Sequence, residues 1–257
     1  GRVWFQETAG QLWYLRKTEG GYQSQKVFQF PYEIRQVSWF NGGFWVLTNS
    51  AVYRMIENSD GTLVVGRQYP YSMKFGDVQI GSRAYVFHFA GKSRVLVGFN
   101  TGILSLDLKK GEWDEIREFS GISIRSIEQV EGLGILAGSY GDGYFLISEG
   151  KVLKMPMDRE GRLNSVHSFI RDKRGYLWMP TNEGIVRASV GELAEYVSDH
   201  SVSPSFRIFN ERDGLLSNEF NGGCNPAYVV SGDTVVVPST AGLVMFLPNN
   251  FCKIVYY

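Results

Sequence analysis

Short runs of β-branched and aromatic residues alternate with clusters of Gly, Asn, Asp and Ser along the whole chain. Residues 166–187 show the unit clearly, because two turns, at 172–175 and 181–184, divide them into three short apolar segments. Apolar runs of this length, bounded by turn residues, are typical of strands joined by hairpins. The segment therefore predicts a three-stranded antiparallel meander.

The same pattern recurs, which indicates an internal repeat. Further copies are found at residues 34–55, 84–105 and 124–145, and less regular ones at 3–22 and 220–246. Each copy has one apolar anchor in its second strand: Trp13, Trp45, Leu96, Leu136, Trp178 and Val236. The anchors lie about 45 residues apart on average, near the period of a propeller blade. A fourth strand is predicted after most copies, at 23–28, 61–66, 113–116 and 151–155, so each unit is predicted to hold four strands.

The repeat predicts an all-β fold, a β-propeller of about six or seven four-stranded blades, because a lone meander cannot bury both of its faces. The propeller is expected to cover residues 1–250, with blades at 1–30, 31–69, 80–119, 120–158, 162–200 and 215–248. Six copies leave room for one more blade upstream of Gly1. One short helix is expected at 190–197. A parallel β-helix is the competing fold, but its coils repeat at shorter spacing.

Charge and composition narrow the range of functions. The 257 residues include 26 Lys plus Arg and 26 Asp plus Glu, so no net charge attracts nucleic acid. No apolar run reaches the roughly 18 residues that suggest a membrane span. Two cysteines, Cys224 and Cys252, are too few for a disulfide framework or a cysteine-rich zinc site. Either one bridge or two buried thiols fits the sequence.

Catalytic and cofactor motifs are scarce. The three histidines, His88, His167 and His200, lack the spacing of metal ligands, and no Gly-x-Ser-x-Gly elbow occurs. Cys224 has no neighbouring base in the sequence, and the Gly-Lys-Ser turn at 90–93 lacks the first glycine of a phosphate-binding loop. We therefore expect no cofactor, no metal and no enzymatic activity in this chain.

A polar set recurs at one position of the predicted inner strands. Aligning the copies brings six residues into register: Arg2, Arg35, Tyr85, Arg125, His167 and Asn221. Because inner strands line the axis of a propeller, this set is expected to form a polar ring at one level. Two interpretations of the ring stay open. Either its cationic and aromatic members hold an acidic sugar, or its side chains bond to neighbouring blades and water.

Turns between second and third strands supply a second set of candidates: Tyr140, Asp142, Asn182 and Glu183. Strand alternation puts these turns at the end of the blades where the inner strands begin, and therefore beside the ring. Loops at the ends of rigid elements commonly carry binding residues. We expect the ring and these turns to form one ligand-binding face, although Asn182 also suits a purely structural role in its turn.

Two stretches carry a family resemblance. Residues 172–185 follow the pattern Asp-x-x-Gly-x-Leu-Trp, a short gap, and Thr-x-x-Gly-Ile. Residues 213–221 read DGLLSNEFN, followed by Thr-Ala-Gly-Leu at 240–243 and Phe-x-Pro at 246–248. These motifs resemble the two-component regulator propeller repeat. The resemblance spans essentially the whole chain and is strongest from residue 120 onward.

This resemblance implies the sensor region of a bacterial hybrid two-component system, in the periplasmic part of a membrane-anchored, homodimeric parent. It implies an oligosaccharide ligand, the parent's other domains as partners, and a histidine kinase and DNA-binding regulator outside this chain. Residues 251–257 would then begin an immunoglobulin-like module. Two alternatives stay open: a glycan-active propeller enzyme of the sialidase or lyase kind, and a propeller that binds only proteins.

Overall fold

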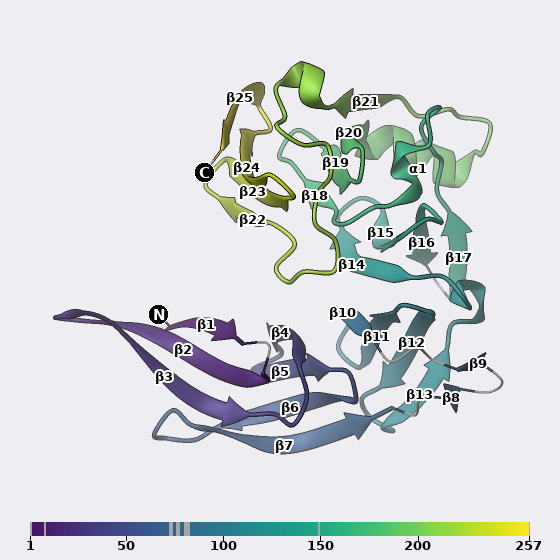
Figure 1. Ribbon diagram of the computed structural model, residues 1–257. Helices are drawn as coiled ribbons and strands as arrows, with labels where there is room; N and C mark the ends of the chain where they lie inside the picture. The colour runs from purple at the N-terminus through teal and green to yellow at the C-terminus, as the bar shows by residue number, and fades with distance from the viewer. Residues whose placement is uncertain are drawn as a thin grey trace.

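The computed structural model describes the backbone of residues 2–7, 9–71, 74–75, 78–79, 83–148 and 150–256, and their side chains except at 2, 74–75, 78–79 and 250–256. Within these residues the strands form six antiparallel sheets that follow one another in chain order around a common centre (Figure 1). A short two-stranded hairpin lies outside these sheets. The prediction of an all-β propeller is therefore confirmed, and the chain forms six blades.

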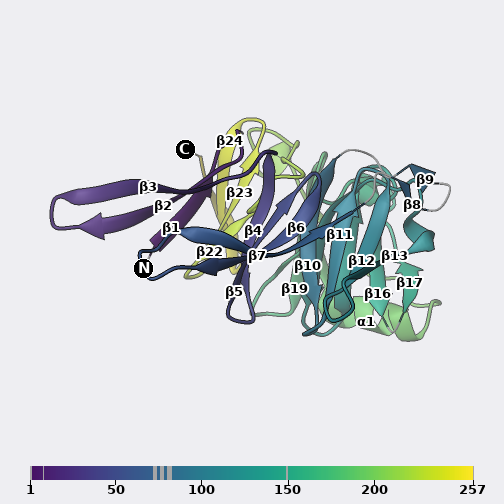
Figure 2. The same ribbon diagram turned by 90° about the horizontal axis from the view of Figure 1, so that it is seen from below.

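The first sheet has three strands and the other five have four each. In chain order, the sheets are β1 (Arg2–Gln6), β2 (Gln11–Thr18) and β3 (Gly21–Gln29); β4 (Ile34–Phe40), β5 (Gly43–Thr48), β6 (Ala51–Glu57) and β7 (Leu63–Pro70); β10 (Ala84–Ala90), β11 (Arg94–Phe99), β12 (Gly102–Asp107) and β13 (Glu112–Glu115); β14 (Ile124–Val130), β15 (Gly134–Ser139), β16 (Tyr144–Ser148) and β17 (Lys151–Lys154); β18 (Ile170–Arg171), β19 (Tyr176–Thr181), β20 (Gly184–Ser189) and β21 (Phe206–Phe209); and β22 (Val229–Ser231), β23 (Thr234–Ser239), β24 (Gly242–Leu247) and β25 (Asn250–Tyr256). The extra hairpin is β8 (Lys74–Phe75) and β9 (Val78–Gln79). Figure 2 shows that the β2–β3 hairpin projects beyond the other blades.

Apolar side chains are buried between neighbouring sheets. Five buried clusters join the six sheets in succession. In the cluster between the fifth and sixth sheets, the fully buried Trp178 packs on Phe209, with 5.2 Å between ring centroids. Among the described side chains, no buried cluster joins the last sheet to the first. Each blade thus depends on its sequence neighbours for its core, as expected for stacked repeats.

The carboxylate of Asp172 explains the Asp-x-x-Gly-x-Leu-Trp motif. Its Oδ1 accepts hydrogen bonds from the backbone N–H groups of Arg174, at 2.9 Å, and Tyr176, at 2.8 Å. Its Oδ2 accepts one from the indole N–H of Trp178, at 2.9 Å. One side chain therefore holds the first turn of the blade and fixes the buried anchor of the second strand.

The first sheet begins at a different strand from the one that the sequence alignment assigned. A Cβ on Gly184, which opens the third strand of the fifth blade, would lie 2.3 Å from the carbonyl oxygen of Phe209. A Cβ on Gly10 would lie 2.7 Å from the carbonyl oxygen of Phe30 in the same kind of close approach. Trp4 precedes Gly10 by the same six residues that separate anchor and glycine in the fifth blade. Strands β1, β2 and β3 therefore correspond to second, third and fourth strands.

This finding corrects two predictions. The anchor of the first blade is Trp4 rather than Trp13, and Trp4 packs on Phe44 of β5 with 4.6 Å between ring centroids. Arg2 lies on a second strand, paired with Arg16, and not on an inner strand. It does not belong to the ring, and its side chain lies outside the described residues. The alignment failed because aromatic residues stand at suitable positions in both β1 and β2, so either tryptophan fits the pattern.

The inner strand of the last sheet is interrupted. Phe220 bridges to Ser239, and β22 resumes pairing with β23 only at Val229. The N–H of Asn221 still donates to the carbonyl oxygen of Pro238 in β23, and after it the chain leaves the sheet and bows toward the centre of the molecule (Figure 1). We call residues 221–228 the axial loop. The extra length of this less regular copy therefore lies within its inner strand.

Two blade boundaries also differ from the predicted ones. The helix α1 (Val190–Ser198), which matches the expected helix, stands between the third and fourth strands of the fifth blade, so that blade continues to Phe209. Residues 250–256, where the predicted immunoglobulin-like module would begin, pair with β24 as the outermost strand of the sixth blade. Outer strands carry no turn motif of their own, which is why the repeat pattern placed these ends too early.

Candidate functional site

Three inner strands contain a bulge directly after their first residue. In β14 the cross-strand pairing passes from Ile124 to Ser126 and skips Arg125. The pairing skips Arg35 in β4 and Tyr85 in β10 in the same way. A bulge releases its residue from the ladder and re-aims the side chain. The repeat thus presents one polar or aromatic side chain per blade at a fixed level.

The fifth and sixth blades continue this arrangement. His167 follows Val166, which bridges to Thr181, and Asn221 follows Phe220 in the equivalent place. Five of the six predicted ring residues therefore occupy equivalent positions, as the alignment of inner strands indicated.

Arg125 is the centre of the ring's contacts. Its guanidinium carbon lies 3.9 Å from the centroid of the Tyr85 ring and 5.0 Å from that of Tyr140. Tyr85 is buried, whereas Tyr140 is 50% exposed. Burial lowers the pKa of Arg125; Tyr85 and Tyr140 oppose this effect, and neighbouring arginines add to it. Within the described residues no carboxylate forms an ion pair with Arg125.

Arg35 and His167 have partners of their own. The Nε of Arg35 donates to the carbonyl oxygen of Ala84 in the next blade at 2.9 Å, and its Nη1 pairs with Glu33 at 2.8 Å. The Nε2 of His167 lies 2.7 Å from Oδ1 of Asn182. Burial lowers the pKa of His167, so its imidazole is neutral near pH 7. Among the arginines of the ring on these inner strands, Arg125 is therefore the one that forms no ion pair within the described residues.

The axial loop fills the centre of the ring. The Nδ2 of Asn225 donates to the carbonyl oxygen of Tyr85 at 2.9 Å and to that of Arg35 at 3.4 Å. Gly222 lies so close to His167 that a Cβ would come within 2.2 Å of Nδ1. The sixth blade thereby contacts the second, third and fifth across the axis. A ligand at this end must bind over the loop and beside it, not inside an open ring.

The turn residues lie where the alternation put them. Tyr140 contacts Arg125, and Asn182 bonds to His167, so ring and turns share one end of the blades. Asp142 and Glu183 are exposed, and the backbone N–H of each donates to a hydroxyl oxygen of its own turn. Their carboxylates form no ion pair within the described residues.

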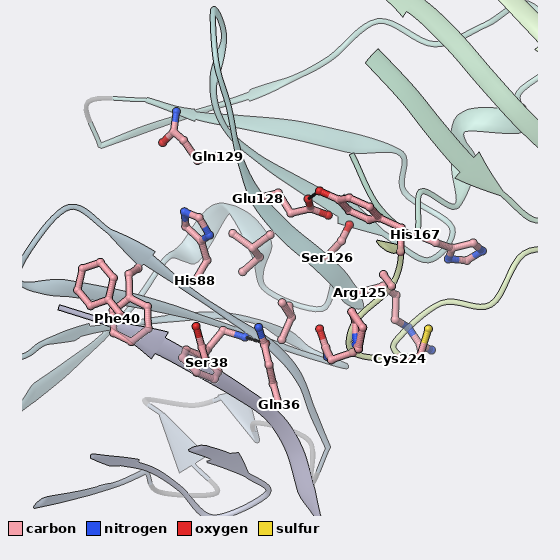
Figure 3. A pocket seen from close by; sticks show the side chains of 18 of the residues that line it. Gln36, Ser38, Phe40, His88, Arg125, Ser126, Glu128, Gln129, His167 and Cys224 are labelled. Atoms are coloured by element: carbon pink, nitrogen blue, oxygen red, sulfur yellow. Dashed lines mark hydrogen bonds between the residues drawn. The ribbon is translucent and has the colours of Figure 1, made fainter. Parts of the chain in front are cut away.

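A cavity of about 860 Å³ runs along the inner strands from the ring toward the opposite end of the axis. Figure 3 shows its side chains converging from β4, β10 and β14, with the axial loop on one side. Its lining includes Gln36, Ser38, Phe40, His88, Phe89, Lys92, Arg125, Glu128, Gln129, His167, Cys224 and Tyr228. Sequence reasoning selected only two of these, Arg125 and His167, as ligand-binding candidates.

Three of the missed residues share one signal. Ser38, His88 and Glu128 each pair across the sheet with the anchor of their own blade. Because each bulge adds one residue, they stand three positions after the ring residue rather than two. Strand alternation without a bulge predicts that the buried Phe87 and Ile127 share the face of the ring residues. The cavity residues were therefore not predicted.

Glu128 is the sole carboxylate among the residues that line the cavity. Its Oε1 accepts from the backbone N–H of Phe169 at 3.1 Å, and its Oε2 accepts from the hydroxyl of Tyr228 at 2.9 Å. Burial raises the pKa of Glu128 to about 7, against the lowering effect of these two hydrogen bonds. Burial also lowers the pKa of His88, so this imidazole is neutral at pH 7.

Cys224 is a free, half-buried thiol beside Arg125, and its Sγ donates to the carbonyl oxygen of Asn221 at 3.6 Å. Burial raises its pKa, which is the opposite of what an activated nucleophile needs. The side chain of Cys252 lies outside the described residues. In the described part of the chain no three His, Cys, Asp or Glu side chains gather as a metal site, and no helix is long and apolar enough to cross a bilayer.

The blades and the plugged axis define the class of molecule, a six-bladed β-propeller with a cavity along its axis. Comparison of the chain with known protein families finds no match. Among curated proteins the chain is similar to "Histidine kinase P4" of Formosa agariphila, with 25% identity over 179 residues, which are 66% of this chain and 12% of that protein. The chain therefore spans a small part of that relative.

Solved structures share the fold. The extracellular domain of the hybrid two-component system BT4673 from B. thetaiotaomicron superposes with a TM-score of 0.67 at 15% identity, over 99% of this chain and 36% of that one. Virginiamycin B lyase from Staphylococcus aureus superposes with a TM-score of 0.66 at 12% identity, over 100% of this chain and 80% of the lyase. The resemblance to two-component sensor propellers is therefore confirmed as a similarity, and the same fold also occurs in an enzyme.

Proposed function

We propose that this chain is a non-catalytic, extracytoplasmic ligand-sensing propeller of a hybrid two-component system. The similarity to a histidine kinase and to the extracellular domain of a hybrid system supports this proposal. The ligand-binding event would be passed to a kinase outside this chain, in a periplasmic, membrane-anchored and dimeric parent. The transcriptional regulator would likewise belong to the parent.

The ligand is an acidic oligosaccharide bound at the ring end of the blades. The observation that carries this proposal is the position of Arg125, a guanidinium held between Tyr85 and Tyr140 without an acidic partner among the described residues. A guanidinium pairs bidentately with carboxylate or sulfate. Tyr140, half-exposed beside it, offers an aromatic surface for a sugar ring. The exposed Asp142 and Glu183 border this surface and favour a ligand that directs its hydroxyl groups toward them.

An enzymatic function is the second candidate, and one observation favours it. Glu128 has a pKa near 7 in a cavity along the axis, which is the property of a general acid or base. The lyase with the same fold makes this alternative concrete. No nucleophile with a lowered pKa accompanies Glu128 among the described residues, so we give the sensor function precedence.

One experiment separates these functions. The chain is titrated by calorimetry with a tetragalacturonate and with the neutral galactotetraose, and the same mixtures are analysed for products by chromatography. The sensor proposal expects binding of the acidic sugar, at least about tenfold tighter than the neutral one, without turnover. Turnover of either sugar would overturn the non-catalytic proposal. Binding of neither would overturn the acidic-oligosaccharide proposal and favour a propeller that binds proteins.

The residues are tested in the same assay. Arg125→Ala should remove the preference for the acidic sugar, and Tyr140→Ala should weaken both sugars. Arg94→Ala, an exposed arginine on β11, is the matched control and should change neither affinity. Unchanged binding in both site variants would move the site away from the ring end.

A further inference from the structure

The axial cavity contains one acidic side chain. Among the residues that line it, Glu128 is the sole carboxylate, while Lys92 and Arg125 are the cations. Neither of these cations forms an ion pair with Glu128. Figure 3 shows Glu128 and Arg125 at different places along the cavity. The region around Glu128 therefore lacks a positive charge from the described part of the chain.

The hydrogen bonds of Glu128 suit an anion. Both carboxylate oxygens accept hydrogen bonds, one from the backbone N–H of Phe169 and one from the hydroxyl of Tyr228. An ionised carboxylate is an acceptor only, whereas a protonated one must also place an O–H donor. A largely buried carboxylate without a cation is costly, because buried charges are normally paired. The carboxylate of Glu128 can thus accept hydrogen bonds from a cation, but no cationic side chain of the described residues pairs with it.

Aromatic side chains form a wall of the same cavity. The rings of Phe40 and Phe89 stack with 3.9 Å between centroids and an interplanar angle of 9°. Phe87 meets Phe89 edge to face at 5.4 Å. Aromatic faces attract organic cations and also bury their carbon skeletons. A carboxylate and aromatic rings in one cavity are together the chemistry that recognises an amine.

We propose that the axial cavity is a second ligand site, which binds a small organic cation such as a protonated primary amine. The ammonium group would bind the Glu128 carboxylate, and its carbon skeleton would pack on Phe40 and Phe89. Gln36 and Ser38 line the same cavity and offer polar groups for further substituents. The proposal goes beyond the sensing of an acidic sugar at the ring end, because it rests on different residues and the opposite charge.

The test uses benzylammonium and its neutral counterpart benzyl alcohol as probes. Both are titrated into the chain by calorimetry at pH 8, where the carboxyl group of Glu128 is mostly ionised. Benzylammonium should bind at least about tenfold more tightly than the alcohol. Equal affinities, or no benzylammonium binding up to about 10 mM, would overturn the proposal.

A variant assigns the effect to the carboxylate. Glu128→Gln keeps the shape and an acceptor for Phe169, and should abolish the preference for the ammonium over the alcohol. Glu112→Gln on β13, an exposed position outside the cavity, is the control and should preserve it. An unchanged preference in Glu128→Gln would place the cation elsewhere. If Glu128→Gln does not fold, as judged by circular dichroism, the comparison of the two probes on the unchanged chain decides.

Discussion

Arg125 stacks on Tyr85 at 3.9 Å, and the two residues occupy the same bulged position in neighbouring inner strands. Bulges at the same register in β10 and β14 therefore bring side chains from adjacent blades into face-to-face contact. This contact does two things at once, because it joins β10 to β14 and holds the guanidinium beside Tyr140. The candidate ligand site is thus also part of the packing between blades.

Arg125→Ala and Tyr140→Ala should differ in their effect on stability. Arg125 is half-buried against two rings, so its removal should lower the free energy of unfolding by about 1–2 kcal/mol. Tyr140 is 50% exposed, and its removal should cost less than about 1 kcal/mol. Urea unfolding of both variants measures this. A loss from Arg125→Ala no larger than that from the exposed Arg94→Ala would contradict the structural role of the stacked guanidinium.

Asp172→Ala should lower the free energy of unfolding by about 2–4 kcal/mol. The change removes the acceptor of three hydrogen bonds, one of which comes from the indole N–H of the fully buried Trp178. Asp114→Ala, at an exposed position of β13, is the matched control and should stay within about 0.5 kcal/mol of the unchanged chain. Thermal unfolding measures both variants. Equal losses in the free energy of unfolding would contradict the structural role of Asp172.

The fold was readable from the sequence because each blade repeats the same local solution. The fifth blade has a turn held by Asp172, a buried anchor, and a glycine that packs against a backbone oxygen. Features of this kind recur at fixed spacing in the sequence. The level of the ring residues was readable for the same reason, since they stand at one offset from the anchor. Where two tryptophans, Trp4 and Trp13, offered the same spacing, the pattern could not choose between them.

The axial cavity could not be predicted from the sequence. Its residues depend on bulges that shift the alternation by one, and on a loop that leaves the sixth blade to cross the axis. Glu128 looks like any polar residue of a strand until Tyr228, one hundred positions later, is placed beside it. Long-range approaches of this kind are set by the closure of the fold and leave no local pattern.

Gly184→Ala should be far more damaging than Gly175→Ala. Both glycines have a positive φ, 119° and 83°, so both substitutions carry backbone strain of at least about 1 kcal/mol. At Gly175 a Cβ would meet nothing within 4 Å, whereas at Gly184 it would lie 2.3 Å from a backbone oxygen of β21. Chemical denaturation should show an additional loss of about 2 kcal/mol or more for Gly184→Ala. Equal losses would mean that β21 does not pack closely on the start of β20.

The stability of Glu128→Gln relative to the unchanged chain should be higher at pH 8 than at pH 5. In the unfolded chain Glu128 has a pKa of about 4.3, and burial raises its pKa to about 7 in the folded state. Between these two pKa values the carboxyl group of Glu128 is protonated in the folded state and ionised in the unfolded state. Its contribution to the free energy of unfolding therefore falls as pH rises. The loss is nearly complete by pH 8 and amounts to at most about 4 kcal/mol in total.

The amide has no such titration. The melting temperature of Glu128→Gln minus that of the unchanged chain should therefore increase from pH 5 to pH 8. Because the difference is taken between two proteins at each pH, the titration of His88 and His167 largely cancels. A difference that is constant over this range would show that Glu128 titrates normally.

Gly222→Ala should detach the axial loop from the ring. The added Cβ would lie 2.2 Å from Nδ1 of His167, and that ring is held in place by its hydrogen bond to Asn182, so the loop must move. Movement of the loop would also strain the hydrogen bonds from Asn225 to the second and third blades, which tie the sixth blade to the far side of the axis. We expect a melting temperature several degrees lower, because the loss of a few kcal/mol has an effect of this size in a chain of this length. Gly20→Ala is the control, since Gly20 also lacks a positive φ and a Cβ there meets nothing within 4 Å. Equal melting temperatures for the two variants would show that the loop does not rest on His167 and that the blades are held together without it.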